Sequence, residues 1–182
     1  MQRRMVLGYG LAAALAGSLR RTWAATDPAP GKISIEQFSA AGKSEGLAEV
    51  DKVVKTEAQW RAQLTPASFN ITRQAGTEAP FSGEYDHNKA DGLYRCICCN
   101  TALFDSKTKF DSGTGWPSFW RAISRVNVVK STDRSFGMVR DEITCRLCDA
   151  HLGHVFEGEY LTPKNVRHCV NSVSMKFVPL EK

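Results

Sequence analysis

The chain has 182 residues, of which 42% are hydrophobic, so it is long enough for one domain with a sizeable core. Its 24 Lys and Arg exceed its 19 Asp and Glu by five, but four basic residues (Arg3, Arg4, Arg20 and Arg21) precede the first acidic residue, Asp27, and the rest of the chain has an excess of one. Because affinity for nucleic acid comes largely from neutralising phosphates, this nearly neutral body excludes nucleic acid as the main partner.

Residues 1–24 have the features of a targeting segment. Arg3 and Arg4 precede an apolar stretch, Met5 to Leu19, that is too short to span a membrane. Paired arginines before a moderately apolar region resemble a bacterial twin-arginine signal, which predicts export to the periplasm, although Gln2 fits that pattern only in part. A segment without acidic residues also suits a mitochondrial presequence, but the uninterrupted apolar run argues against that alternative.

Residues 25–49 are small, polar and aperiodic, with Pro28 and Pro30 near their start, which predicts a linker. We expect one catalytic domain over residues 50–182. Its first part, residues 55–73, has apolar residues spaced among polar ones and is divided by Pro66, which predicts two short helices.

After Gly76 the pattern changes to short segments of strand length, separated by Gly, Asp, Asn and Pro. This is typical of a mainly β domain with antiparallel sheets, folded as a sandwich or barrel. The expected strands are Leu93–Cys96, Ala102–Phe104, Val126–Lys130, Phe136–Arg140, Glu142–Cys145, His154–Glu157 and His168–Phe177.

Two Cys-x-x-Cys pairs predict a structural zinc site. Each pair can present two thiolates from the tip of a hairpin, and two pairs complete a tetrahedral site with no position open for substrate. Forty-five residues separate the pairs, so the tertiary fold must bring them together. The expected ligands are Cys96, Cys99, Cys145 and Cys148.

The alternative for these pairs is that one of them is a redox dithiol, which an oxidising compartment would close into a disulfide. Twin-arginine export avoids that outcome by moving a domain already folded around its metal. Cys98 lies inside the first pair and has no zinc role by its spacing, so we expect a bystander thiol there.

Cys169, near the C-terminus, has the surroundings of a reactive thiol. In a strand, alternation of side chains places Arg167, Cys169 and Asn171 on one face, followed by Val173, Met175 and Phe177. A guanidinium beside a thiol favours the thiolate, which is the nucleophilic form. A lone cysteine in a strand is more often an inert core residue, but Arg167 and Asn171 would then be buried without purpose. We therefore predict a nucleophile.

His151 and His154 are candidates for proton transfer. Either one can instead be a structural residue, or a zinc ligand beside Cys148. Four cysteines already complete the metal sphere, which leaves both histidines for acid chemistry.

Residues 113–120 place Trp116, Phe119 and Trp120 on a loop stiffened by Pro117. By itself, an aromatic loop of this kind is more typical of core packing than of a binding pocket.

Taken together, the segments "GTEAPFSGEYDHNKADGLYRCICC", "SGTGWPSF", "CRLCDAHLGHVF" and "RHCVNSVSMKF" resemble the B-type methionine sulfoxide reductases. The resemblance covers about residues 50–178. It implies two antiparallel β-sheets with short N-terminal helices, a structural zinc ion, and reduction of the R epimer of methionine sulfoxide in oxidised proteins and peptides.

By this resemblance, Cys169 is the catalytic nucleophile and Trp116 receives the methyl group of the substrate. Phe177 matches an aromatic position near the site. The zinc ligands match the four cysteines of the two pairs, and the polar residues around the sulfoxide match His151, His154, Arg167 and Asn171.

These residue types suit sulfoxide chemistry. An aromatic wall and hydrogen-bond donors orient the sulfur towards the thiolate. Charge then develops on oxygen, to which His154 can donate a proton with His151 and Asn171 in support. Cys169 becomes a sulfenic acid.

One position departs from the family pattern. Many members carry a resolving cysteine in "SGCGWPSF", where this chain has Thr114, so the usual recycling disulfide cannot form. We expect a thioredoxin-type or other external thiol to reduce Cys169 directly, with Cys98 as the alternative, and we expect a monomer.

Two other functions compete with this interpretation. A cysteine hydrolase would use Cys169 with a histidine as base, but no oxyanion-hole motif is evident. A zinc-braced binding module would use Trp116 and Trp120 as contact residues, and it would keep its activity without the Cys169 thiol.

Overall fold

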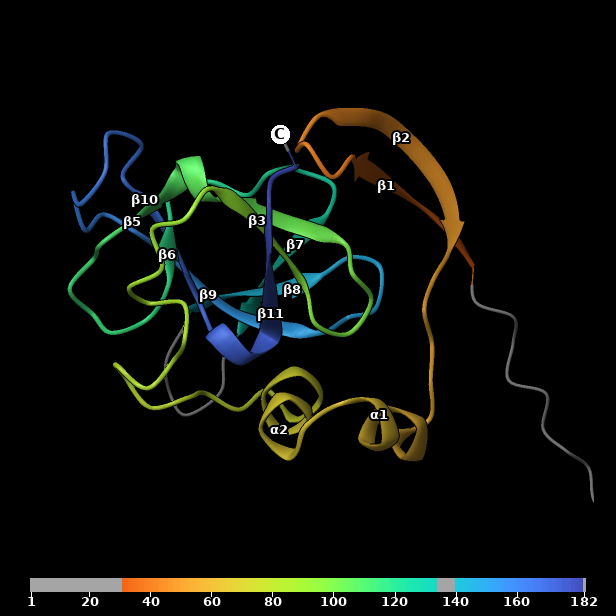
Figure 1. Ribbon diagram of the computed structural model, residues 1–182. Coiled ribbons are helices and arrows are strands. Elements are labelled where there is room, and N and C mark those ends of the chain that lie inside the picture. The colour runs from red at the N-terminus through yellow and green to blue at the C-terminus, as the bar shows by residue number, and fades with distance from the viewer. Residues whose placement is uncertain (1–30, 134–139, 182) are drawn as a thin grey trace, which may run out of the picture.

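The computed structural model describes residues 31–133 and 140–181, and within these ranges the fold is mainly β. A six-stranded sheet and a three-stranded sheet form the body, and a two-stranded hairpin lies beside them (Figure 1). Every strand pair is antiparallel, which confirms the expected fold class.

In spatial order, the six-stranded sheet consists of β5 (Lys109–Phe110), β6 (Ser118–Phe119), β10 (Val166–Val170), β9 (His151–Glu157), β8 (Arg140–Cys145) and β7 (Val128–Asp133). The three-stranded sheet consists of β11 (Met175–Pro179), β3 (Gly92–Cys96) and β4 (Ala102–Asp105), and the hairpin of β1 (Lys32–Phe38) and β2 (Ser44–Asp51). Short 3₁₀ turns cover Ser106–Thr108 and Ser172–Ser174. The predicted strand at residues 136–140 falls outside the described residues except for Arg140, which begins β8.

The two helices are separated where Pro66 predicts a break, which confirms that expectation. Helix α1 (Glu57–Gln63) begins with a capping box, in which the Thr56 hydroxyl and the Gln59 side chain each accept the other's backbone N–H. Helix α2 (Pro66–Gln74) has Pro66 in its first turn, where a missing N–H costs nothing. In Figure 1 both helices lie below the sheets, and α2 packs against β9 and the turn after β10.

The core lies between the two larger sheets. The Phe119 ring on β6 stacks on Phe104 of β4 with centroids 4.4 Å apart, and it meets Tyr94 of β3 edge-on at 5.0 Å. All three side chains are fully buried. Burial of three aromatic side chains at one junction fixes the sheets against each other.

The predicted linker over residues 25–49 is wrong for the part that the structure describes, because residues 32–51 form the β1–β2 hairpin. The hairpin is held by contacts with distant residues. The buried Asn127 amide accepts from the Glu36 N–H at 2.8 Å and donates to the Glu36 carbonyl at 2.9 Å. Arg95 donates to the Phe38 carbonyl at 3.0 Å. The sequence of the hairpin itself therefore gives little indication that it forms strands.

The expectation of one strand over residues 168–177 is also wrong. The strand β10 ends at Val170, a 3₁₀ turn follows Asn171, and β11 then joins the other sheet. The Ser174 N–H and hydroxyl both donate to the Asn171 carbonyl, at 3.2 and 2.7 Å, and close this turn. The predicted common face therefore does not extend to Val173 or beyond.

Candidate active site and metal centre

Strand pairing places the predicted nucleophile beside a predicted proton donor. Cys169 on β10 is the direct partner of His154 on β9, and His154 is in turn the partner of Glu142 on β8. Directly opposed residues of antiparallel strands point to the same face, with Cβ atoms about 5 Å apart. Ser118 on β6 continues the same row. One row across the sheet thus carries a carboxylate, an imidazole, a thiol and a hydroxyl.

A cavity of about 140 Å³, which we call the Cys169 pocket, opens on this face. It contains four of the predicted site residues, Trp116, His154, Cys169 and Asn171, and its other lining residues are Thr77, Gly153, Phe156 and Val170. A larger cavity of about 730 Å³ is lined by His168, whose side chain lies on the other face of β10, and none of its lining residues is a cysteine. The chemistry therefore belongs to the smaller cavity.

Arg167 is buried close to the nucleophile but is engaged by a carboxylate that the sequence analysis missed. Its Nε and Nη2 atoms donate to the two oxygens of Glu159 at 2.6 and 2.8 Å, and its guanidinium lies 4.6 Å from the centroid of the Phe156 ring. The Nη1 atom donates to the Thr114 hydroxyl at 3.3 Å. A bidentate pair of this kind fixes the side chain in place.

These surroundings act in opposite directions on Cys169. Burial raises the pKa of its thiol, whereas the charge of Arg167 and a hydrogen bond from it lower that pKa. The carboxylates of Glu159 and Glu78 raise the pKa again, and the net shift is upward. The guanidinium favours the thiolate as expected, but burial outweighs it.

Glu78 is a second residue that sequence reasoning missed, and it connects Trp116 with Asn171. The Trp116 indole N–H donates to the Glu78 carbonyl at 3.1 Å, and the Glu78 N–H donates to Oδ1 of Asn171 at 3.0 Å. The Glu78 carboxylate accepts the backbone N–H groups of Ser172 and Val173. No local pattern marks this glutamate, because Trp116 lies 38 residues away and its other partners lie more than ninety residues away.

The side chain of Asn171 is largely occupied by hydrogen bonds within the protein. Besides accepting from Glu78, its side chain donates to the Leu152 carbonyl at 3.0 Å. An amide has two N–H donors, so one remains for a ligand in the pocket. Asn171 is both a wall of the pocket and a support for the segment that carries Glu78.

Three predicted site residues do not line the pocket: Arg167, described above, His151 and Phe177. His151 is buried behind it, with Nδ1 2.6 Å from Oε1 of Glu142 and its ring 5.5 Å from the ring of His154. Phe177 lies on β11 in the other sheet, where its ring packs against Tyr94 at 5.2 Å and Tyr85 at 6.4 Å. Phe177 lies in the other sheet because the chain changes sheets after Asn171, and its predicted place near the substrate stays a prediction.

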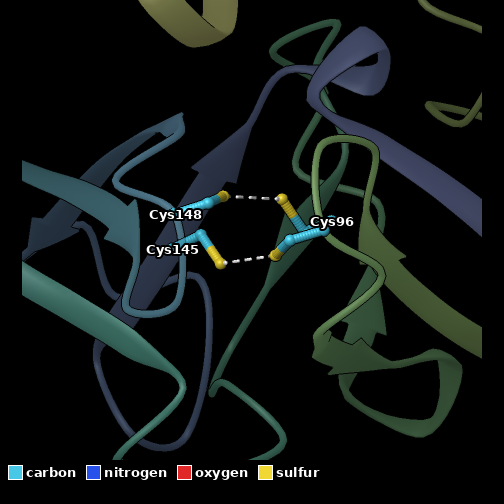
Figure 2. A group of neighbouring side chains, drawn as sticks. Cys96, Cys145 and Cys148 are labelled. Carbon is cyan, nitrogen blue, oxygen red and sulfur yellow. Dashed lines mark hydrogen bonds between the residues drawn. The ribbon is translucent and has the colours of Figure 1, made fainter. Parts of the chain in front are cut away.

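The four paired cysteines come together as predicted and form a candidate metal centre, separate from the Cys169 pocket. The first pair follows β3 and the second follows β8, so the centre joins the two sheets (Figure 2). Their Sγ atoms all lie within 4.8 Å of one another, with 3.7 Å between Cys96 and Cys148 and 3.5 Å between Cys99 and Cys145. A tetrahedron with metal–sulfur bonds of about 2.3 Å has sulfur atoms about 3.8 Å apart, so the spacing fits.

Both cysteine pairs have the same backbone turn. The Asn100 N–H donates to the Cys96 carbonyl at 2.9 Å, and the Asp149 N–H donates to the Cys145 carbonyl at 2.8 Å. Asn100 and Asp149 have φ angles of 67° and 55°, a left-handed conformation that Asn and Asp tolerate well. The fifth cysteine of this region, Cys98, is buried within the first turn and its thiol is not one of the four clustered sulfurs.

The family model of the SelR domain matches residues 64–179, which include the Cys169 pocket and the four clustered cysteines. Among similar proteins, the peptide methionine sulfoxide reductase MsrB of Pseudomonas fluorescens (strain Pf0-1) is 53% identical over 133 residues, 72% of this chain and 100% of that protein. The protein of the same name from Herminiimonas arsenicoxydans is 51% identical over 127 residues, 70% of this chain and 92% of its own length. The protein of the same name from Synechococcus sp. (strain RCC307) is 54% identical over 127 residues, which cover 70% of this chain and 93% of that protein.

Proposed function

The chain belongs to the SelR-domain family of B-type peptide methionine sulfoxide reductases, and on this premise we propose that the Cys169 thiolate reduces methionine-R-sulfoxide in oxidised proteins by attack on sulfur. The observation that carries this assignment is the direct cross-strand pairing of Cys169 with His154 at the edge of a small pocket. Family membership also favours a reductase over a cysteine hydrolase or a binding module.

The pocket has groups for each part of the substrate. The Trp116 ring offers an aromatic wall for the methyl group, and it is held by its bond to Glu78. His154 and the remaining N–H of Asn171 are donors for the sulfoxide oxygen. This arrangement turns the sulfur towards Cys169, which lines the same cavity.

The step balances without a cofactor. The thiolate attacks sulfur as the sulfoxide oxygen takes up one proton, from His154, and the sulfur–oxygen bond of the substrate and the transient bond between the two sulfur atoms then break. The oxygen ends on Cys169 as a sulfenic acid, and methionine leaves as the thioether. Sulfur of the substrate is reduced by two electrons, and sulfur of the enzyme is oxidised by two.

The sulfenic acid is reduced by an external thiol of the thioredoxin type. Among the lining residues of the pocket, Cys169 is the sole cysteine. Thr114 stands where many family members carry the resolving thiol, and its hydroxyl is bonded to Ser112 at 2.8 Å and to Arg167. A hydroxyl cannot form the recycling disulfide. Cys98 is confined to the first cysteine turn.

The metal is zinc, held by the four clustered thiolates. Four sulfur ligands leave no coordination position for substrate, so the ion braces the junction between β3 and β8 and supplies no catalytic step. Its contribution is to folding, because the site assembles only when the two sheets meet.

The test is epimer-specific turnover by the full chain with dithiothreitol as reductant. A peptide containing methionine-R-sulfoxide should be reduced, the S epimer should not, and Cys169→Ser should abolish the reaction. Trp116→Ala should raise KM through loss of the methyl wall. Equal turnover of both epimers, or activity in Cys169→Ser, would refute the proposal.

A further inference from the structure

A partly buried bond between Glu142 and His151 has no part in the mechanism above. Oε1 of Glu142 lies 2.6 Å from Nδ1 of His151, whose side chain is only 5% exposed. Neither residue lines the Cys169 pocket. Burying such a polar pair costs desolvation that an apolar pair of similar volume avoids, so stability alone gives little reason for it.

The bond sets the tautomer of His151. A carboxylate only accepts hydrogen bonds, so the shared proton belongs on Nδ1 of the imidazole. The other ring nitrogen, Nε2, is buried and has no hydrogen-bond partner among the residues that the structure describes. Glu142 therefore determines both the orientation and the proton arrangement of this ring.

Both members of the pair contact the pocket's proton donor. Glu142 is the direct cross-strand partner of His154, and the His151 ring meets the His154 ring edge-on with centroids 5.5 Å apart. At the register shift between Ile143 and Thr144, β9 has one extra residue, Leu152, so His151 pairs with Thr144 and its side chain falls on the same face as that of Glu142. The three side chains form a cluster one strand away from Cys169.

We propose that Glu142 is a positioning residue for sulfoxide reduction, acting through His151 on His154. By holding His151 it fixes the His154 ring at the wall of the pocket. This inference rests on the proposed function, because it assigns Glu142 to the proton-donation step.

Asp141 supplies a matched control. It precedes Glu142 on β8, so its side chain points to the opposite face, and its carboxylate pairs with Lys130 at 2.7 Å. The two carboxylates have similar exposure, 33% for Asp141 and 27% for Glu142. Asp141→Asn and Glu142→Gln therefore remove the same charge from the same strand, on different faces.

The experiment measures single turnover of a methionine-R-sulfoxide peptide by the full chain over a range of peptide concentrations. Glu142→Gln should lower the saturating rate by about 10- to 100-fold, part of the range that general acid catalysis provides, with half-saturation within about twofold of wild type. Asp141→Asn should change both quantities by less than about twofold, because its partly exposed ion pair with Lys130 lies on the face away from His154. A wild-type saturating rate in Glu142→Gln would overturn the proposal.

Two further readouts distinguish positioning from a structural role. The ¹⁵N spectrum of the histidine rings should show Nδ1 of His151 protonated in wild type and an altered pattern in Glu142→Gln. Alkylation of Cys169 by iodoacetamide should stay within about twofold of wild type, because the thiol's neighbours Arg167, Glu159 and Glu78 are untouched. An unchanged His151 signal, or a slower rate explained by weaker peptide binding alone, would overturn the proposal.

Failure of the proposed function has a different signature. Sulfoxide reduction by Cys169→Ser would refute the nucleophile, whatever Glu142→Gln does. If Cys169→Ser loses activity as expected while Glu142→Gln keeps the wild-type rate, only the positioning role of Glu142 is refuted.

Discussion

A Cβ atom on Gly153 would lie 2.0 Å from the carbonyl oxygen of Cys169. The φ angle of Gly153 is +154°, and its strand approaches β10 next to the nucleophile. Glycine is therefore required for the two strands to pair closely at this point, where Gly153 itself lines the pocket.

Gly153→Ala should lower the free energy of unfolding by more than about 3 kcal/mol and abolish most sulfoxide reduction, since backbone must move to admit the methyl group. Gly158→Ala is the control, because Gly158 also has a positive φ angle, +85°, but nothing lies within 4 Å of its added Cβ. That variant should lose only about 1 kcal/mol. Urea unfolding measures both, and equal losses would contradict the contact explanation.

The pH dependence of thiol alkylation should respond in opposite directions to the two members of the Arg167–Glu159 pair. The Glu159 carboxylate raises the pKa of Cys169 and Arg167 lowers it. Glu159→Gln should therefore move the alkylation profile to lower pH, and Arg167→Ala should move it to higher pH. Shifts of the same sign would show that reorganisation of the pocket dominates over charge.

The same pair makes a contribution to stability that depends on pH. The bond from Arg167 lowers the pKa of Glu159 below its ordinary value. The stabilising effect of the pair is thus fully present above the pKa that the Glu159 carboxyl has in the unfolded chain. It is lost as the pH falls through the lower pKa that this carboxyl has in the folded protein. The difference in melting temperature between wild type and Glu159→Gln should shrink as the solution is acidified in that range. A difference that grows with acidification would be inconsistent with this pair.

Recycling should proceed through a sulfenic acid on Cys169 that is not consumed by an internal disulfide. One equivalent of substrate without reductant should yield dimedone-modified Cys169 in the peptide map, and Cys98→Ser should turn over normally with a thioredoxin-type donor. Thr114→Cys should place a thiol beside Arg167, form a disulfide with Cys169 and reduce trapping. A disulfide between Cys98 and Cys169 in the wild-type chain would show that Cys98 is the resolving residue instead.

The metal centre should contain one zinc ion per chain. Cys148→Ser should lose the metal and lower Tm by roughly 10 °C or more, because metal binding is coupled to folding. Cys98→Ser is the matched control and should retain the metal, since its sulfur is not one of the four clustered atoms. Metal analysis and thermal unfolding measure both variants, and an unchanged melt in metal-free protein would argue against zinc as a brace.

Export can be tested apart from catalysis, because residues 1–24 lie outside the described part of the chain. Residues 1–30 fused to a reporter that folds before transport should deliver it to the periplasm of a bacterial host. The double substitution Arg3→Lys and Arg4→Lys should block delivery if the pair is a twin-arginine signal. Delivery that does not depend on this pair would favour another route.

No helix in the described ranges is long and apolar enough to cross a membrane.

The sequence by itself determined those features that depend on neighbours along the chain. Pro66 divides the helices because proline lacks an N–H and favours the first turn of a helix. The spacing of each cysteine pair suffices for one turn that presents two thiolates to a metal. Short segments separated by Gly, Asp, Asn and Pro located β3, β4, β7, β8 and β9 to within a few positions, but not β1, β2, β5 or β6. Several motifs in a fixed order identified the family.

Only the tertiary structure decided which of these pieces meet. Asn127 holds Glu36 across 91 positions and thereby orders a hairpin whose own residues read as a linker. The chain crosses between sheets at Asn171, which removes Phe177 from the pocket, while strand register sets Glu142 against His154. Such contacts leave no local pattern, because each depends on atoms supplied by another strand. Burial, likewise set by the whole fold, outweighs Arg167 in its effect on the pKa of Cys169.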